Sequence, residues 1–229
     1  MALQAMYYDV SVTCLSDIGL IRQNNEDALK LLNDEHFYVI ADGMGGHQAG
    51  EVASRETVEE LCHLFQQRMQ VPPKDLVRCE DILKQLIKEV NTKVYRIGRE
   101  SPALKGMGTT LCCVLLHPEG LIYAHVGDSR IYRLRNREFE QLTKDHSLLR
   151  ELIDMGQLSE QQAEEFLYKN IITKAIGTES CVEPSVAGSS LESGDKLLLC
   201  TDGLTDMLCN EEIKEILLHE SEEECVNLL

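Results

Sequence analysis

An apolar run that ends in an Asp-Gly turn occurs twice in this chain, and it limits the possible folds more than any other feature. The first run, 38–41 (YVIA), leads into Asp42 and a glycine-rich stretch, and the second, 197–201 (LLLCT), leads into Asp202. Short runs of aliphatic and β-branched residues are typical of buried strands, and glycine allows the sharp turn that ends each one. Each carboxylate is therefore expected at the rim of a sheet, where side chains from distant segments can gather around a hard cation.

Hydrophobic periodicity divides the chain into strands and helices without a linker or an internal repeat. Short apolar runs and alternation predict strands at 8–14, 28–32, 36–41, 109–116, 121–126, 131–134, 139–142, 170–176 and 196–200. Helical spacing predicts helices at 50–69, 74–99, 211–219 and from 222 onward, with a polar, helix-like segment at 146–168 that breaks at Gly156. The sequence therefore predicts one α+β domain over 1–229.

Composition restricts the partners. The formal net charge is −17, which argues against nucleic acid and against anionic membrane surfaces, because both need a basic face. An acidic protein that handles an anionic substrate needs local positive charge, which bound divalent cations can supply. No apolar run approaches the ~20 residues of a membrane helix. Nine cysteines without a CxxC pair, and no secretory pattern at the N-terminus, predict reduced thiols in a cytoplasmic protein.

Five carboxylates are candidates for cation binding. Asp128 follows the strand at 121–126 and a glycine, as Asp42 and Asp202 follow their strands. A single Asp-Gly or Gly-Asp pair is more often a simple turn, but that interpretation weakens when three recur at strand ends. Oxygen ligands with few His or Cys nearby favour Mg²⁺ or Mn²⁺ over Zn²⁺. The set is Glu26, Asp27, Asp42, Asp128 and Asp202.

Other polar residues near these carboxylates are weaker candidates. The glycines of 43–50 match neither nucleotide-binding fingerprint, so they either free carbonyls for a metal or let a helix start close to the sheet. Arg22, four residues before Glu26, is either a solvated surface group or a bidentate phosphate ligand. His47 and His146 suggest acid or base chemistry, although a structural role is the more common one.

Seven stretches, in this order, resemble the metal-dependent serine/threonine protein phosphatases of type 2C (the PPM family), and most closely their compact bacterial branch. They are spread over nearly the whole chain, so the match is far more specific than a single Asp-Gly motif. The stretches are 16–28 (SDIGLIRQNNEDA), 39–54 (VIADGMGGHQAGEVAS), 106–111 (GMGTTL), 124–135 (AHVGDSRIYRLR), 142–148 (LTKDHSL), 172–177 (ITKAIG) and 197–208 (LLLCTDGLTDML).

The resemblance implies a fold in which two packed antiparallel β-sheets form a central sandwich flanked by pairs of α-helices. It also implies a centre of two Mg²⁺ or Mn²⁺ ions, whose bridging water attacks the phosphorus of a phosphoserine or phosphothreonine. By motif, Asp42 would bridge both ions, the carbonyl of Gly43 would bind one, and Asp202 would be a further ligand. Asp128 would help to hold a third ion. Residues 146–168 fall where the family places its flap.

The resemblance also assigns the substrate and water contacts, with two departures from the family pattern. Arg22 would bind the substrate phosphate and Glu26 would hold metal-bound water. Met44 stands where some relatives carry a His proposed as the acid for the leaving group, so a metal-bound water would serve instead. Family members close with an Asp-Asn pair, whose Asp is a ligand, and a final apolar strand. This chain ends at Leu229 within the preceding helix, so we expect that strand to be missing.

Three functions stay open on the sequence. The favoured one is an active phosphoprotein phosphatase, with phosphorylated targets of a partner Ser/Thr kinase as substrates. The second is a catalytically silent module that binds phosphoproteins or a signalling partner, which the early end favours and the intact acidic set opposes. The third is a metal-dependent hydrolase of small phosphoesters. Compact members of the family act as monomers, and the same is expected here.

Overall fold

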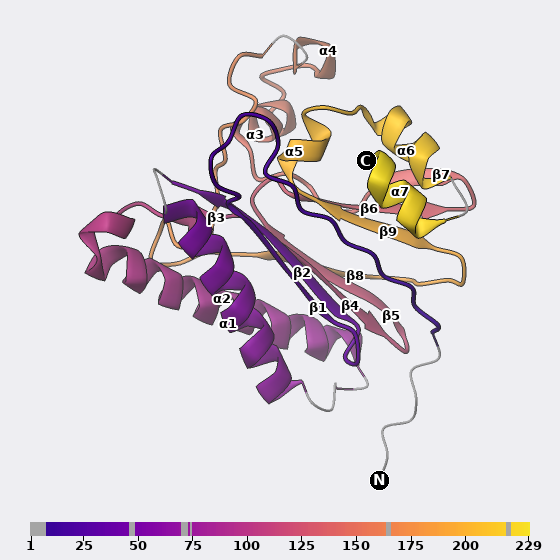
Figure 1. Cartoon of the computed structure of the whole chain (residues 1–229), viewed down its shortest axis with the longest axis horizontal. Helices are drawn as coiled ribbons and strands as arrows, with labels where there is room; N and C mark the ends of the chain where they lie inside the picture. The colour runs from indigo at the N-terminus through magenta and orange to yellow at the C-terminus, as the bar shows by residue number, and fades with distance from the viewer. Residues whose placement is uncertain (1–7, 46–48, 70–72, 74, 164–165, 219–220) are drawn as a thin grey trace.

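The computed structural model describes residues 8–45, 49–69, 73, 75–163, 166–218 and 221–229. Two antiparallel sheets face each other and helices cover their outer faces (Figure 1), which confirms the predicted α+β sandwich. The elements are β1 Asp27–Leu32, β2 Phe37–Met44, α1 Ala49–Arg68, α2 Leu76–Glu100, the 3₁₀ turn η1 Pro102–Leu104, β3 Gly108–Thr109, β4 Leu111–His117, β5 Gly120–Val126, β6 Arg130–Arg135, β7 Glu138–Gln141, α3 Leu148–Asp154, α4 Glu160–Ala163, β8 Ser185–Ser189, β9 Lys196–Cys200, α5 Asp202–Thr205, α6 Asn210–Leu217 and α7 Glu222–Leu228.

The larger sheet has the order β1-β2-β4-β5-β8, with β3 paired to β2, and the smaller sheet has the order β7-β6-β9. The chain passes from the larger sheet to the smaller one between β5 and β6, in the short turn at 127–129. That turn contains Asp128. The change of sheet therefore brings the third predicted carboxylate to the junction of the two layers.

Strand β4 explains why its sequence is a continuous apolar run. Successive side chains point to opposite faces of a strand. Leu111 and Cys113 belong to the core beneath the helices. Cys112 and Val114 belong to the cluster that joins the larger sheet to β6 and β9. Both faces of β4 are buried, so no polar residue interrupts it.

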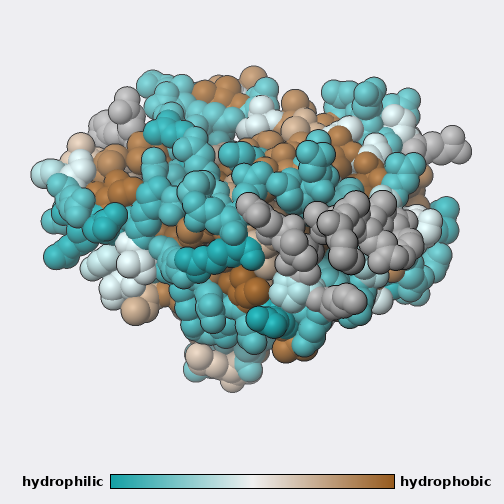
Figure 2. Space-filling model, turned by 90° about the horizontal axis from the view of Figure 1, so that it is seen from below, coloured by the Kyte–Doolittle hydropathy of each residue, from teal (hydrophilic) through white to brown (hydrophobic). Residues whose placement is uncertain are grey.

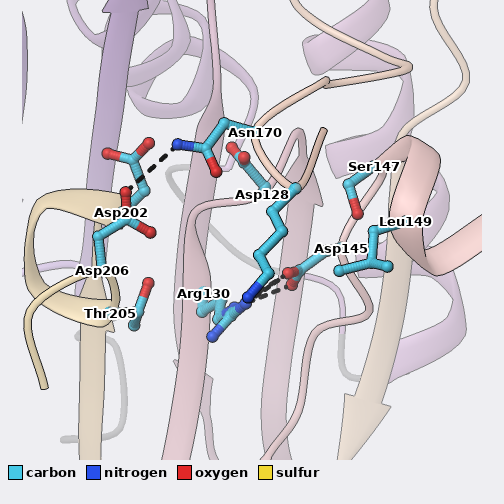
Figure 3. Close-up of a pocket in the computed structure, with 10 residues that line it drawn as sticks. Asp128, Arg130, Asp145, Ser147, Leu149, Asn170, Asp202, Thr205 and Asp206 are labelled. Carbon is cyan, nitrogen blue, oxygen red and sulfur yellow. Dashed lines mark hydrogen bonds and ion pairs between the residues drawn. The ribbon is translucent and has the colours of Figure 1, made fainter. Parts of the chain in front are cut away.

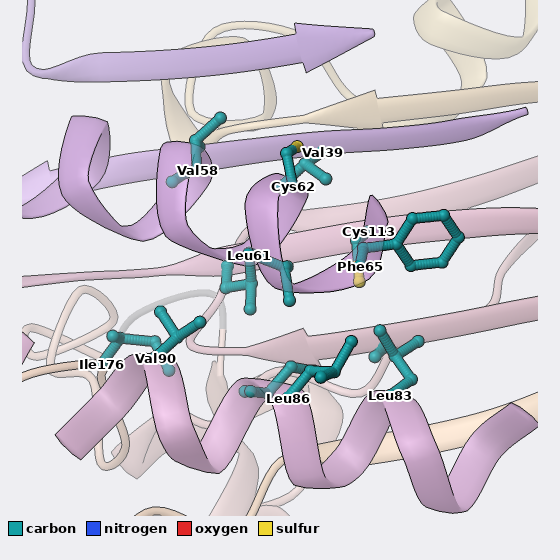
Figure 4. Close-up of a cluster of buried hydrophobic side chains, with 14 of the residues drawn as sticks. Val39, Val58, Leu61, Cys62, Phe65, Leu83, Leu86, Val90, Cys113 and Ile176 are labelled. Atoms are coloured by element: carbon teal, nitrogen blue, oxygen red, sulfur yellow. The ribbon is translucent and has the colours of Figure 1, made fainter. Parts of the chain in front are cut away.

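Helices α1 and α2 cover the outer face of the larger sheet. Asp75 caps α2 by accepting a hydrogen bond from the Val77 N–H at 3.0 Å. Below that cap, apolar side chains recur at helical spacing, and Leu86 and Val90 meet Leu61 of α1 in a fully buried cluster (Figure 4). Each such side chain contributes on the order of 2 kcal/mol by leaving water. This layer holds β2 rigidly and thereby fixes the strand that carries Asp42.

The smaller sheet is covered by α6 and α7. Ile213 and Leu217 of α6 pack with Cys225 of α7 against Leu134 and Leu198 of the sheet. Seen from below, hydrophilic side chains cover most of the surface and hydrophobic ones lie between them (Figure 2). Within the described ranges, no helix combines the length and the apolar character needed to cross a bilayer.

Four sequence expectations differ from the structure. Residues 8–14 are not a strand: Val10 and Val12 pack on the cluster between the sheets, which explains their alternation, but no described strand pairs with them. Residues 170–176 form single bridges, not a strand. The helix-like segment at 146–168 is divided into α3 and α4, with the expected break at Gly156. Strand β8, sequence SVAGS, was not predicted because small residues give no clear period.

Candidate active site

Six of the residues predicted for the site line one pocket at the ends of the strands, whereas the candidate carboxylate Asp27 is not in its lining. They come from distant parts of the chain: the segment before β1, the end of β2, the turn between β5 and β6, and the start of α5 after β9. Asp42 and Asp202 therefore share a pocket, as the sequence interpretation required. The predicted residues in its lining are Arg22, Glu26, Asp42, Gly43, Asp128 and Asp202.

The backbone of Asp42 is held by the conformation of the segment at 109–110. The Asp42 N–H donates to Thr110 Oγ1 at 2.9 Å, and the Thr110 N–H donates back to the Asp42 carbonyl at 2.8 Å. Thr109 Oγ1 donates to the same carbonyl at 2.8 Å. Both threonines are buried, and Thr110 Oγ1 is also 2.6 Å from Ser129 Oγ. This network links the Asp42 strand end to the turn that carries Asp128.

Two glycines allow α1 to start directly against the strand end. A Cβ on Gly43 would lie 2.1 Å from the Gly50 carbonyl oxygen, and a Cβ on Gly50 would lie 2.5 Å from Glu26 Oε1. No side chain fits at either position without moving its neighbour. The Gly43 N–H also donates to the Glu26 carbonyl at 3.0 Å. Of the two roles that the sequence allows for these glycines, this contact shows the second, in which a helix starts close to the sheet.

The carboxylates crowd one another. Burial raises the pKa of Asp42 to about 8, and the charges of Asp27 and Asp202 add to the effect. Burial likewise raises the pKa of Asp128 to about 6, with the charge of Asp202 as the next cause. The pKa of Asp27 is also raised by burial, although its hydrogen bond from Thr201 opposes the rise. The carboxylates that line the pocket therefore outnumber the one cationic side chain in its described lining, Arg22.

This donor set suits hard divalent cations. The available donors are carboxylate oxygens and the Gly43 carbonyl, the chemistry that Mg²⁺ and Mn²⁺ prefer. Among the described residues, no group of three or more acidic, His or Cys side chains is arranged so that it could hold one metal ion. Mg²⁺ commonly keeps several waters and uses only one or two carboxylates per ion, so an open, shared arrangement fits it. Burial and the neighbouring carboxylates raise the pKa values of Asp42 and Asp128. A bound cation would lower both pKa values again, because it would stabilise the ionised carboxylates.

Arg22 is the cationic side chain in the lining of this pocket. Its Nη1 lies 3.7 Å from Glu26 Oε2, and 76% of the side chain is exposed. An ion pair of that length and exposure is weak. The guanidinium is therefore available to exchange Glu26 for an anionic ligand, and its planar donors match phosphate oxygens.

A second pocket adjoins the first and shares Asp128, Asn170 and Asp202 with it. In this pocket Arg130 holds Asp145 through three hydrogen bonds of 2.8–3.1 Å (Figure 3). Gln141 also donates to Asp145 at 2.8 Å. Asp145 is therefore bound by Arg130 and not by His146, which agrees with the structural role that the sequence favours for His146.

His146 is structural in this arrangement. Burial lowers the pKa of its imidazole to about 3, with the neighbouring His125 as the next cause, so the ring is neutral. Its ring stacks on that of His125 with centroids 4.6 Å apart. His47, the other candidate acid, lies outside the described residues. Met44, at the end of β2, does line the pocket.

Sequence reasoning missed Asn170. Its side chain lies between the two pockets, and its Nδ2 donates to Asp206 Oδ2 at 3.4 Å (Figure 3). Asn170 follows the segment predicted as the flap and sits in a region wrongly predicted as a strand. An isolated Asn in polar sequence gives no signal of its own, so only the tertiary structure identifies it.

Residues 22–224 match the family profile described as Protein phosphatase 2C. The chain belongs to the protein phosphatase 2C family. Protein phosphatase PhpP of Streptococcus pneumoniae is 39% identical over 210 residues, which cover 90% of this chain and 84% of that protein. Serine/threonine phosphatase stp of Listeria monocytogenes is 38% identical, with 88% of this chain and 81% of that protein covered. The predicted family is thus confirmed, and the chain is a phosphatase of the 2C type.

Solved structures of the family have the same fold. The serine/threonine phosphatase PstP/Ppp of Mycobacterium tuberculosis is similar with a TM-score of 0.83 at 35% identity, covering 93% of this chain and 87% of that one. A catalytic domain of PstP in complex with two manganese ions is similar with a TM-score of 0.80 at 36% identity, covering 93% and 86%. At this similarity the 2C-type phosphatases share the sandwich, and metal dependence is a property of the family.

Proposed function

We propose that this 2C-type phosphatase hydrolyses phosphoserine and phosphothreonine in proteins, with the phosphoryl group held in the pocket of Asp42 and Asp202. One observation carries the proposal: residues predicted from separate motifs line a single pocket at the strand ends. Relatives named as serine/threonine phosphatases support the same substrate class. Water is the second substrate, and the reaction releases inorganic phosphate and the free hydroxyl.

The acidic residues divide between cation binding and water orientation. Two bound Mg²⁺ or Mn²⁺ ions would lower the pKa of a water between them and neutralise the phosphoryl oxygens. Asp42 and Asp202, with the Gly43 carbonyl, would hold this pair, and Asp128 would help to hold a third ion. Glu26 would accept a hydrogen bond from the attacking water and direct it toward the phosphorus. The two manganese ions bound to a catalytic domain of PstP support the binding of a pair of ions.

Arg22 supplies the substrate contact. As the cation in the pocket lining, it binds two phosphoryl oxygens and releases its weak pairing with Glu26. That binding fixes the phosphorus in line with the water that Glu26 orients, which reduces the entropy of reaching the transition state. Because Arg22 is largely exposed, it can engage a phosphate that is attached to a folded protein.

The finer assignments belong to the same proposal. The substrates are phosphoproteins made by a partner Ser/Thr kinase, and the enzyme acts as a cytoplasmic monomer without nucleic acid or membrane as a partner. Residues 146–168 serve as the flap beside the pocket, within one catalytic domain over 1–229. A silent binding module is less well supported, because Arg22 and four carboxylates, Glu26, Asp42, Asp128 and Asp202, line one pocket.

The test is phosphate release from a phosphothreonine peptide in Mn²⁺. Asp42→Asn is expected to lower kcat/KM roughly 100-fold or more, because it weakens the binding of both ions. Chelation should abolish activity, and Arg22→Ala should raise KM about tenfold or more without changing Mn²⁺ binding. Asp81→Asn, on the exposed face of α2, is the matched control and should behave as the wild type. Activity that survives both Asp42→Asn and chelation would reject the proposal, and hydrolysis of small phosphoesters alone would favour the third function.

A further inference from the structure

The peptide that precedes Asp128 is bonded twice to one histidine. The Gly127 N–H donates to His146 Nδ1 at 3.2 Å, and the His146 N–H donates to the Gly127 carbonyl at 2.9 Å. These two contacts join the turn between β5 and β6 to the segment that leads into α3. The first uses the imidazole, so it depends on the identity of residue 146.

The imidazole is held at both ring nitrogens and on one ring face. Because Nδ1 accepts a hydrogen bond, the proton of the neutral ring is on Nε2, which donates to Ser185 Oγ at 2.9 Å. One ring face stacks on His125, and the His146 carbonyl accepts from the Thr173 N–H at 2.8 Å. Only 9% of the residue is exposed. A ring held in this way keeps its acceptor in one place.

The Gly127 peptide decides where Asp128 points. Gly127 has φ +100°, in the region that favours glycine, and an added Cβ would lie 2.7 Å from Thr110 Cγ2. The conformation of this turn is therefore constrained on one side by Thr110 and on the other by His146. Asp128 projects from it into the pocket that also contains Asp202.

We propose that His146 is a positioning residue, which holds the Gly127 peptide and thereby aims Asp128 at its metal ion. The inference rests on the proposed role of Asp128 as a ligand. Residues that orient a ligand through hydrogen bonds commonly change metal affinity by about 10- to 100-fold when they are replaced. His146 would act in this way without touching substrate or metal.

A second buried histidine provides the comparison. His117, only 3% exposed, accepts from the Glu119 N–H at Nδ1 and lies 2.9 Å from the Pro73 carbonyl through Nε2. It makes the same two kinds of contact as His146, but at the end of β4 in a turn that contributes nothing to either pocket. Replacement of His117 therefore measures what the loss of a bonded, buried histidine does to the fold alone.

The experiment compares three His variants by calorimetric Mn²⁺ titration, with unfolding measured in parallel. In His146→Gln the amide can replace Nε2 but not the Nδ1 acceptor, so Mn²⁺ binding at the Asp128 site should weaken about tenfold or more. In His146→Asn the side-chain oxygen takes the place of Nδ1, and affinity should stay within about threefold of the wild type. His117→Gln should lower stability and leave Mn²⁺ binding unchanged. A folded His146→Gln with wild-type affinity, or a His146→Asn as weak as His146→Gln, overturns the inference.

Asp128→Asn separates this inference from the proposed function. It should remove the same binding event that His146→Gln weakens. If Asp128→Asn binds Mn²⁺ like the wild type, the ligand role of Asp128 is wrong and the inference is overturned with it. If His146→Gln does not fold, ¹⁵N-histidine NMR of the wild type replaces it. Mg²⁺ should then shift the His146 Nδ1 resonance in the wild type and leave it unmoved in Asp128→Asn, and an unmoved wild-type resonance overturns the inference.

Discussion

At the scale of single residues, the pocket depends on the closeness of α1 to the end of β2. Gly50→Ala would place a Cβ 2.5 Å from Glu26 Oε1 and 2.9 Å from the carbonyl carbon of Gly43, so the Glu26 carboxylate or the end of β2 must move. Because misplacing a group that orients a reactant by about 1 Å can lower the rate about 100-fold, we expect a fall in kcat of that order. The measurement is steady-state hydrolysis of a phosphothreonine peptide, with circular dichroism to verify the fold.

Gly203→Ala is the matched control for this prediction. Gly203 follows the proposed ligand Asp202, and its added Cβ would meet only Thr201 Oγ1, at 3.8 Å. The substitution is exposed and should change kcat by no more than about twofold. Wild-type kcat in Gly50→Ala would show that Glu26 tolerates displacement, and its role in orienting water would then be wrong.

The six site residues could be predicted because each lies inside a short contiguous motif. Asn170 and the contact of Gly127 with His146 could not be predicted in this way. Their partners are distant in sequence, and nothing in the local pattern distinguishes a polar residue that meets the pocket from one that meets solvent. The contact between Gly50 and Glu26 is a similar case. The sequence allows these glycines either to free carbonyls for a metal or to let a helix start close to the sheet, and only the packing of α1 against β2 shows that the second applies at Gly50.

At the scale of elements, the Arg130–Asp145 pair fastens β6 to the segment before α3. Only 14% of the Asp145 side chain and 29% of the Arg130 side chain are exposed. Arg130→Met keeps much of the apolar volume but leaves Asp145 without its cation. Breaking a buried pair in this way typically costs 3–5 kcal/mol, and the partial exposure of Arg130 places the expected loss at about 3 kcal/mol. Urea unfolding measures it.

Arg68→Met serves as the comparison for Arg130→Met. Arg68 also makes a two-armed contact, with Glu89 at 2.6 and 2.8 Å, but both side chains are nearly half exposed. Solvent screens such a pair, so its loss should leave the unfolding midpoint almost unchanged. Equal effects in the two variants would mean that burial does not distinguish the pairs, and that the Arg130 contact does not fasten these elements.

The elements that could be predicted are those whose own sequence carries the pattern. Helix α2 and strand β4 have strong periods or long apolar runs, and both form. Residues 8–14 alternate as a strand does, yet strand pairing requires a neighbour, which no sequence period encodes. Strand β8 is the opposite case: its sequence has no clear strand pattern, but its backbone pairs with β5 in the folded chain.

At the scale of the whole molecule, a chain with a net charge of −17 gathers at one point several carboxylates that are not paired with a cation among the described residues. The ordinary pKa of an aspartate is near 4. In the metal-free folded state the pKa of Asp42 is about 8 and that of Asp128 about 6, chiefly through burial. Between about pH 4 and pH 8 the folded protein therefore keeps protons that the unfolded chain has released. Burial lowers the pKa of His125 and His146, so below about pH 6.5 the unfolded chain binds protons that these two rings do not bind in the folded state, which opposes the aspartates. Above about pH 6.5 Asp42 sets the sign, and the free energy of unfolding falls as pH rises toward 8.

Thermal unfolding of the chelated protein from pH 6.5 to pH 8 tests this consequence. The midpoint should fall with rising pH, and Asp42→Asn should show a shallower fall, because it lacks the group with the highest pKa. At pH 8 the chelated Asp42→Asn protein should melt above the chelated wild type, by on the order of 5 °C. Mg²⁺ should stabilise the wild type more at pH 8 than at pH 6, since fewer protons compete for the carboxylates. A chelated wild type that gains stability toward pH 8 would contradict the crowding of charge at Asp42. In that case the chelated Asp42→Asn protein should melt below the chelated wild type, because the substitution then only removes a native contact.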